Sequence, residues 1–183
     1  VRPQVLLLDV MDTLVWDPYR LMPEFFGQTW VELISGRNRT GWKEFERAII
    51  DEETFLRTFF EDERAFDQQA FVAMFRHGYR YLDGIEELLG ELRGLRVPMH
   101  ALSNYPSWFQ LIEDKLELSR YLDWTFVSWK TGVRKPAAEA YTGAATALGL
   151  PPEACLFVDD RERNCEGARA VGMPALRFES AAQ

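Results

Sequence analysis

The stretch VLLLDVMDT, residues 5–13, decides the fold class of this chain. Val5 to Leu8 form a short continuous apolar run, which is typical of a strand buried on both faces of a parallel sheet. The run ends at Asp9, so a carboxylate follows the strand directly into a polar turn. Met11, a thioether, then stands between Asp9 and Asp12. This order of residues predicts a site at the carboxyl end of the first strand.

Four further apolar or β-prone runs follow along the chain, at residues 97–102, 124–128, 155–158 and 175–178. Amphipathic helical patterns alternate with them, at residues 84–95, 108–116, 135–148 and 164–171. Strand and helix alternating at these lengths indicate βαβ units with right-handed crossovers. We therefore predict an α/β fold with a Rossmann-like three-layer core around a central parallel sheet.

The segment from residue 15 to residue 81 interrupts this alternation. It shows no clear strand pattern and several amphipathic stretches, including residues 42–50 and 71–81. We predict a small all-helical cap subdomain over residues 15–81, inserted between the two parts of the core at residues 1–14 and 82–183. The many aromatic residues of this segment are interpreted as the core of a helical bundle.

The composition excludes several function classes. A formal net charge of −8 argues against nucleic acid or an anionic membrane as the main partner, and the 47% hydrophobic content argues against disorder. No apolar stretch reaches the roughly 20 residues of a membrane span, and no leader pattern is visible, so we expect a cytoplasmic protein. Cys155 and Cys165 are expected to be free thiols. Both a monomer and a homodimer remain open.

Polar residues end several of the predicted strands. Ligands in open α/β sheets bind beyond the carboxyl ends of the strands, where the strand order reverses. The residues expected there are Asp9, Ser103 with Asn104, Lys135 in the loop after the third strand, and Asp159 with Asp160.

In this order the residues resemble the motifs of the haloacid dehalogenase-like hydrolase superfamily, over nearly the whole chain. The family's motifs are an Asp-x-Asp-x-Thr/Val turn, a strand ending in Ser or Thr, a Lys within Gly-x-x-Lys-Pro, and a strand ending in Asp-Asp. Their matches are Asp9 with Thr13, Ser103, residues 132–136, and Asp159 and Asp160 followed by Asn164. A helical cap directly after the first motif is typical of the subgroup that contains dehalogenases and many small-molecule phosphatases.

The resemblance implies a role for each matched residue. Asp9 is the expected nucleophile, which forms an aspartyl intermediate, and Lys135 neutralises the nucleophile and the phosphoryl group. Ser103 and Asn104 are expected to donate hydrogen bonds to the substrate, and Thr13 and Arg20 are further substrate-binding candidates. Mg²⁺ is the expected cofactor, because it prefers oxygen ligands. Its expected ligands are Asp9, the Met11 carbonyl, Asp159 and Asp160, with Asn164 in support.

Met11 departs from the family pattern, because phosphatases of this family carry an acid/base Asp at that place. Methionine cannot transfer a proton, and general acid–base catalysis is worth about 10²–10⁴-fold in rate. Asp12 is one possible substitute, and a turn cap is its alternative role. Asp17, Tyr19 and Arg20 are candidates for the mouth of the site, and Arg37, Arg39 and Arg47 are candidates for meeting an anionic substrate.

The function expected from the sequence is a Mg²⁺-dependent phosphatase of a small phosphorylated metabolite, slowed by the loss of the acid at Met11. Two alternatives stay open. A 2-haloacid dehalogenase agrees with an apolar residue at position 11, because halide leaves without a proton, but those enzymes need no metal and usually lack the paired acids at Asp159 and Asp160. The other alternative is a catalytically weak protein that uses this fold for binding.

Overall fold

A computed structural model describes residues 3–183 and contains one five-stranded sheet in which every strand pair is parallel. The strand order is β3-β2-β1-β4-β5. The strands are β1 (Val5–Leu8), β2 (Met99–Ser103), β3 (Asp123–Val127), β4 (Cys155–Asp159) and β5 (Ala175–Arg177). The predicted α/β fold with a central parallel sheet is confirmed, and all five predicted strands are present.

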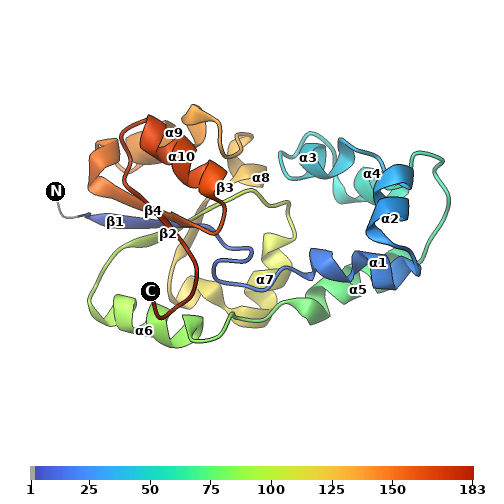
Figure 1. Cartoon of the computed structure of the whole chain (residues 1–183), viewed down its shortest axis with the longest axis horizontal. Coiled ribbons are helices and arrows are strands. Elements are labelled where there is room, and N and C mark those ends of the chain that lie inside the picture. The colour runs from blue at the N-terminus through green and yellow to red at the C-terminus, as the bar shows by residue number, and fades with distance from the viewer. Residues whose placement is uncertain (1–2) are drawn as a thin grey trace.

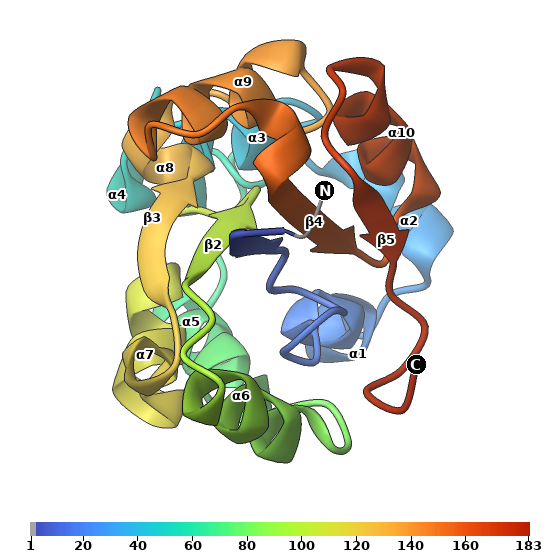
Figure 2. The same cartoon turned by 90° about the vertical axis from the view of Figure 1, so that its left-hand side faces the viewer.

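Helices cover both faces of the sheet, so the core has three layers (Figure 2). Two helices lie on one face and two on the other: α6 (Ile85–Gly94) with α7 (Phe109–Leu116), and α9 (Ala138–Ala147) with α10 (Glu162–Ala170). Two details differ from the prediction. A short helix, α8 (Ser128–Thr131), follows β3, and α9 begins three residues after Lys135, which lies in the preceding loop.

The order of the strands reverses at β1. From β1 the chain moves to β2 and β3 on one side, and it later crosses to β4 and β5 on the other side. Leu8, the last residue of β1, is paired with Ala101 of β2 and with Val158 of β4. The carboxyl ends of these three strands therefore meet at the position where open α/β sheets bind ligands.

The chain between β1 and α6 is helical and lies beyond the carboxyl ends of the strands (Figure 1). Its helices are η1 (Pro18–Leu21), α1 (Met22–Phe26), α2 (Trp30–Gly36), α3 (Gly41–Phe45), α4 (Glu52–Arg57) and α5 (Gln68–Gly78). Val15 and Tyr81 form an antiparallel bridge where the chain leaves the sheet and returns to it. The helical content agrees with the expected cap, while its limits at residues 15 and 81 stay a prediction.

The amphipathic stretch over residues 42–50 is not one continuous helix. Helix α3 ends at Phe45, and Ala48 adopts a left-handed conformation with φ of 55°. The Ile49 N–H bonds the Glu44 carbonyl at 2.9 Å, which closes a turn in place of the next helical turn. Apolar spacing predicts which side of this segment is buried, but it does not predict where the helix ends and the turn begins.

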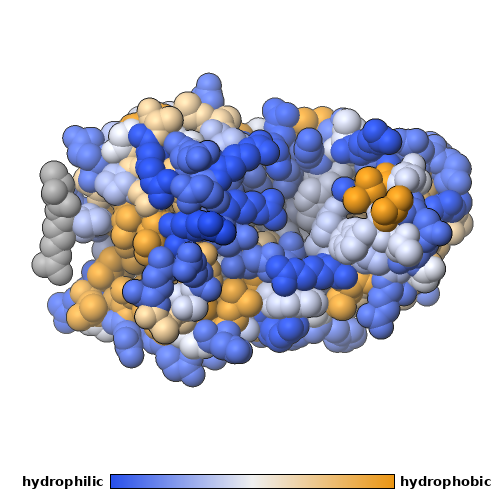
Figure 3. All heavy atoms as spheres, viewed as in Figure 1, coloured by the Kyte–Doolittle hydropathy of each residue, from blue (hydrophilic) through white to orange (hydrophobic). Residues whose placement is uncertain are grey.

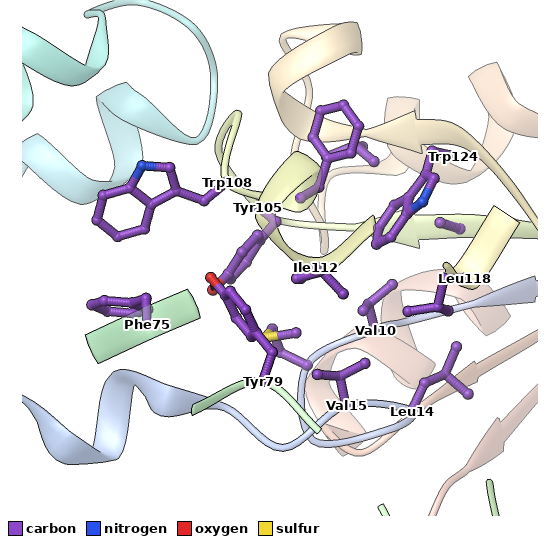
Figure 4. Close-up of a cluster of buried hydrophobic side chains, with 14 of the residues drawn as sticks. Val10, Leu14, Val15, Phe75, Tyr79, Tyr105, Trp108, Ile112, Leu118 and Trp124 are labelled. Atoms are coloured by element: carbon purple, nitrogen blue, oxygen red, sulfur yellow. Dashed lines mark hydrogen bonds between the residues drawn. The ribbon is translucent and has the colours of Figure 1, made fainter. Parts of the chain in front are cut away.

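Aromatic side chains join the helical segment to the core (Figure 4). Trp108, which lies between β2 and α7, packs with its ring centroid 4.8 Å from that of Phe75 in α5 and 5.5 Å from that of Phe45 in α3. The hydroxyls of Tyr79 and Tyr105 are 2.8 Å apart in the same cluster. Burial of such rings is the main stabilising contribution between these parts of the chain.

The surface is mostly hydrophilic in the view of Figure 3, with an apolar patch over α2. In that helix Val31 is 76% exposed and Ile34 is 47% exposed. Within residues 3–183, no helix has both the length and the apolar character that crossing a bilayer requires.

Candidate active site

Three charged side chains from separate segments meet at the carboxyl ends of β1 and β4. The Lys135 Nζ lies 2.8 Å from Asp9 Oδ1 and 2.6 Å from Asp159 Oδ2. All three residues are buried. Removing one member of a buried ionic cluster leaves an uncompensated charge, so the two carboxylates and the ammonium depend on one another.

The backbone and neighbouring side chains fix each member of this cluster. The Asp9 N–H donates to the Val158 carbonyl at 2.9 Å, which holds Asp9 against the end of β4. The Asn104 side-chain amide makes two hydrogen bonds with the Lys135 backbone. Its Oδ1 accepts from the Lys135 N–H at 2.7 Å, and its Nδ2 donates to the Lys135 carbonyl at 2.9 Å. Lys135 is thus held from the loop that follows β2.

Asp159 is saturated with hydrogen bonds. Its Oδ1 accepts from the Arg161 N–H at 2.8 Å, and its Oδ2 accepts from Lys135. The Asn164 Nδ2 donates to both oxygens, at 3.1 and 2.9 Å. Asp160, the next residue, is different, because its Oδ1 is buried and has no hydrogen-bond partner among the described residues.

Burial dominates the electrostatics of the cluster. It raises the pKa of Asp9, against the attraction of Lys135, and repulsion from Asp159 adds to the rise. Burial lowers the pKa of Lys135, yet the two aspartates outweigh it and raise that pKa overall. Burial, with repulsion from Asp9 and Asp159, raises the pKa of Asp160 to about 7. The site therefore concentrates more negative charge than its single lysine compensates.

The three aspartates have the arrangement of a cation site. One oxygen of each of Asp9, Asp159 and Asp160 lies within 4.8 Å of the others. The unpaired Asp160 Oδ1 is the atom that a bound cation would satisfy, and hard oxygen donors of this kind suit Mg²⁺. The donor set therefore fits the expected metal. Asp159 would contribute less than predicted, because its oxygens already accept hydrogen bonds from Lys135, Asn164 and the Arg161 N–H.

A pocket of about 270 Å³ opens over Asp9, between the sheet and the helical segment. It is lined by Asp9, Met11, Asp17, Tyr19, Arg37, Arg39, Trp42, Lys43, Glu46, Asn104, Tyr105, Arg134, Lys135, Arg161 and Asn164. Cationic side chains outnumber anionic ones among these residues. A charged, partly apolar pocket with convergent polar groups suits a small anionic ligand that also carries an apolar part.

The structure places the other predicted residues in different roles. Ser103 is buried at the end of β2, and its Oγ has no partner among the described residues, so it is free to donate to a ligand. The Thr13 Oγ1 accepts from the Asp160 N–H at 3.1 Å, which positions Asp160. Arg20 and Asp12 pair with each other at 2.6 Å and are not among the residues that line the pocket.

Several pocket residues were missed by the sequence analysis. Arg134 and Arg161 are each the sequence neighbour of a matched motif residue, and this adjacency could have predicted their place in the pocket. Glu46 gave no signal, because a glutamate in an amphipathic stretch usually faces water. Instead it is buried, and it accepts hydrogen bonds from the Arg134 guanidinium at 2.6 Å. The Ser128 hydroxyl donates to the Glu46 carbonyl at 2.5 Å, which ties α8 to the helical segment.

A family model for haloacid dehalogenase-like hydrolases matches residues 3–172. The chain therefore belongs to the haloacid dehalogenase-like hydrolases. The resemblance carried by the four motifs is confirmed, and so is the expectation of a hydrolase at the level of the family.

Individual relatives agree with this assignment. Flavin mononucleotide hydrolase 1, a chloroplast protein of Arabidopsis thaliana, is 47% identical over 178 residues, which are 97% of this chain and 73% of the relative. A mutant of the HAD family enzyme BT-2542 from Bacteroides thetaiotaomicron, crystallised with magnesium and inorganic phosphate, has a TM-score of 0.79 at 21% identity, over 99% of this chain and 96% of its own. L-2-haloacid dehalogenase from Xanthobacter autotrophicus has a TM-score of 0.68 at 16% identity, over 96% of this chain and 77% of its own. The two structural likenesses show the shared fold.

Proposed function

We propose that this protein is a Mg²⁺-dependent phosphatase that hydrolyses a small phosphate monoester through an aspartyl intermediate at Asp9. The buried Asp9–Lys135–Asp159 cluster beside the unpaired Asp160 oxygen carries the proposal. Attack by a carboxylate on a phosphate ester brings two anions together, so the site must supply positive charge. Lys135 supplies part of it, and a cation held by Asp9, Asp160 and the Met11 carbonyl, with Asp159 beside them, would supply electrostatic stabilisation of the transferring group.

The remaining groups position the ester for attack. The Ser103 hydroxyl and the Lys135 ammonium would bind the oxygens of the phosphoryl group as charge develops on them. Asn104 acts through the backbone of Lys135, which it holds in place. Thr13 and Asn164 act in the same indirect way, because they bind the Asp160 N–H and the Asp159 carboxylate. The predicted contact of Arg20 with substrate has no support in the geometry.

Flavin mononucleotide is the first substrate to test. The flavin mononucleotide hydrolase shares 47% identity with this chain, and the rings of Tyr19, Trp42 and Tyr105 are among the residues that line the pocket. Aromatic faces bind planar rings by stacking. A pocket of about 270 Å³ lies at the lower limit of small-molecule sites, about 300 Å³, so the helical segment would move outward to admit a ligand of this size.

Substitution of the nucleophile tests the proposed function. We expect Asp9→Asn to lower kcat on p-nitrophenyl phosphate and on flavin mononucleotide by about 10⁴-fold, because the amide cannot form the aspartyl intermediate. Chelation of Mg²⁺ should abolish wild-type turnover, and added Mg²⁺ should restore it. Asp67→Asn is a matched control, because Asp67 caps α5 outside the pocket. Equal rates for wild type and Asp9→Asn would contradict the proposal.

Met11 supports a second candidate function, that of a 2-haloacid dehalogenase. Its side chain lines the pocket two residues after Asp9, so the pocket has an apolar group where a phosphatase would place an acid. The cluster of three aspartates argues for the phosphatase, because halide displacement needs no cation. Halide release from 2-chloropropionate in the presence of a chelator would favour the dehalogenase, and its absence together with Mg²⁺-dependent phosphate release would exclude it.

The other expectations about the whole protein stay predictions. They are a cytoplasmic location, no nucleic-acid or membrane partner, and a monomeric or homodimeric state. The chloroplast location of the Arabidopsis relative does not support the first of them.

A further inference from the structure

The proposed reaction lacks a proton donor at its expected place. The ester oxygen that leaves an alkyl phosphate must be protonated, and the water that cleaves the aspartyl phosphate must lose a proton. Met11 lines the pocket two residues after Asp9 and carries no exchangeable proton. Another group of the pocket must therefore exchange protons if turnover is to be efficient.

Three carboxyl groups line the pocket among the described residues: those of Asp9, Asp17 and Glu46. Asp9 is the nucleophile. Glu46 is engaged by the Arg134 guanidinium at 2.6 Å and is 2% exposed, so its carboxylate is neutralised within an ion pair. Asp12, the substitute considered from the sequence, is paired with Arg20 and is not among the residues that line the pocket. This elimination leaves Asp17.

The loop after β1 fixes the Asp17 carboxyl group in position. The Asp17 Oδ1 accepts a hydrogen bond from the Tyr19 N–H at 3.0 Å, and the backbone N–H of Asp17 donates to Asp12 Oδ1 at 3.3 Å. Its Oδ2 makes no hydrogen bond, and the carboxylate has no salt bridge, within residues 3–183. One oxygen is thus anchored, while the other remains available to a ligand in the pocket.

The charges around Asp17 favour proton exchange near neutral pH. Burial raises the pKa of Asp17 to about 6, with a further rise from Asp12, while the Tyr19 N–H, Arg161 and Arg20 lower it. Arg161 interacts electrostatically with Asp9 as well as with Asp17, and all three residues line the pocket. A group that exchanges protons near the working pH is the most effective general acid and base.

We propose that Asp17 is the general acid and base of this site, in place of the acid that Met11 lacks; this role rests on the proposed phosphatase function. In the first step, an Asp9 oxygen bonds to phosphorus and the bond from phosphorus to the ester oxygen breaks. The ester oxygen keeps the electron pair and takes the proton of the Asp17 carboxyl group. In the second step, Asp17 takes a proton from water, whose oxygen bonds to phosphorus. The bond from phosphorus to Asp9 breaks, and phosphate leaves.

The variant Asp17→Asn separates this role from a structural one, because the amide oxygen still accepts the Tyr19 N–H and keeps the cap of η1. p-Nitrophenolate can leave without being protonated, whereas the alkoxide of flavin mononucleotide must take up a proton as it leaves. We therefore expect a rapid burst of about one p-nitrophenolate per active site, followed by turnover slowed about 10²–10⁴-fold. With flavin mononucleotide or glycerol phosphate, the same variant should release no burst of the alcohol, because the first step then needs the missing proton.

Two further variants complete the experiment. Asp67→Asn removes the charge of another helix-capping aspartate, which accepts the Ala70 N–H at 2.9 Å, and should leave both substrates unaffected. Adding Met11→Asp to Asp17→Asn should restore turnover of the alkyl ester. An unchanged rate for Asp17→Asn on the alkyl ester would overturn the role of Asp17. The role would also be overturned if, with p-nitrophenyl phosphate, this variant lost the rate of the burst and the rate of steady turnover by the same factor. An inactive wild type would instead overturn the phosphatase function itself.

Discussion

At the scale of single residues, the site depends on how Lys135 is placed between two carboxylates. The ammonium is buried, and it is held 2.8 Å from Asp9 and 2.6 Å from Asp159. Its backbone belongs to a loop, and loops keep a geometry only where other groups bind them. Asn104 provides this restraint with two hydrogen bonds to the Lys135 backbone, so it helps determine where the ammonium charge lies.

Truncating Asn104 should therefore impair catalysis more than substrate binding. We expect Asn104→Ala to lower kcat about tenfold or more with a smaller change in KM, and to lower the free energy of unfolding by about 1–3 kcal/mol, because the Lys135 N–H and carbonyl lose their partners. Steady-state kinetics and urea unfolding measure the two effects. Asn38→Ala is the control, because Asn38 Oδ1 accepts the Thr40 N–H at 3.0 Å outside the pocket. Equal effects of both variants on kcat would contradict this role.

The sequence predicted which residues gather at the site better than it predicted what each one contacts. Asp9 and Asp159 follow from strand ends, because the carboxyl ends of neighbouring parallel strands meet at one edge of a sheet, and Lys135 follows from its Gly-x-x-Lys-Pro motif. Asn104 was expected to bind substrate, and it binds the backbone of Lys135. The difference arises because loop conformation decides side-chain partners, and no periodicity encodes it. Asp17 was weighed only as a residue of the pocket mouth, since a lone aspartate after a motif is more often an ordinary surface residue.

At the scale of elements, the helical segment and the core are joined by closely packed aromatic rings. Phe45 of α3 is 1% exposed, and its ring centroid lies 4.8 Å from that of Phe55 in α4 and 5.5 Å from that of Trp108 beyond β2. The continuous apolar runs predicted the strands well, because a strand buried on both faces needs such a run. The helical segment was predicted less well, because the turn at Ala48 depends on this tertiary packing.

Removing one of these rings should destabilise the whole protein. Phe45→Ala is expected to lower the free energy of unfolding by about 3–5 kcal/mol, because it leaves a cavity between α3, α4 and Trp108. Ile49→Ala is the matched control four residues away; Ile49 is 57% exposed, so its truncation should change stability by less than about 0.5 kcal/mol. Denaturant unfolding followed by tryptophan fluorescence measures both. Similar losses for the two variants would show that the ring cluster does not carry the stability assigned to it.

At the scale of the whole molecule, Asp9 and the other two aspartates of the candidate cation site stand at the carboxyl ends of strands in the parallel sheet, and the helical segment lies beyond these ends (Figure 1). The chain leaves the sheet after β1 and returns to it at Tyr81. Residues from both parts line one pocket. The formal charge of −8 makes an anionic substrate unfavourable at long range. The local group of Arg37, Arg39 and Lys43 opposes that repulsion within the pocket.

Trapping the phosphorylated intermediate is the sharpest test of phosphoryl transfer through Asp9. The enzyme is quenched during turnover of p-nitrophenyl phosphate with Mg²⁺ and then reduced with borohydride, which converts an aspartyl phosphate to homoserine. Mass spectrometry locates the reduced residue. We expect reduction at position 9 in the wild type, more of it in Asp17→Asn, where hydrolysis of the intermediate is slowed, and none in Asp9→Asn. If the enzyme turns over its substrate while position 9 stays unmodified, in the wild type and in Asp17→Asn alike, phosphoryl transfer does not pass through Asp9.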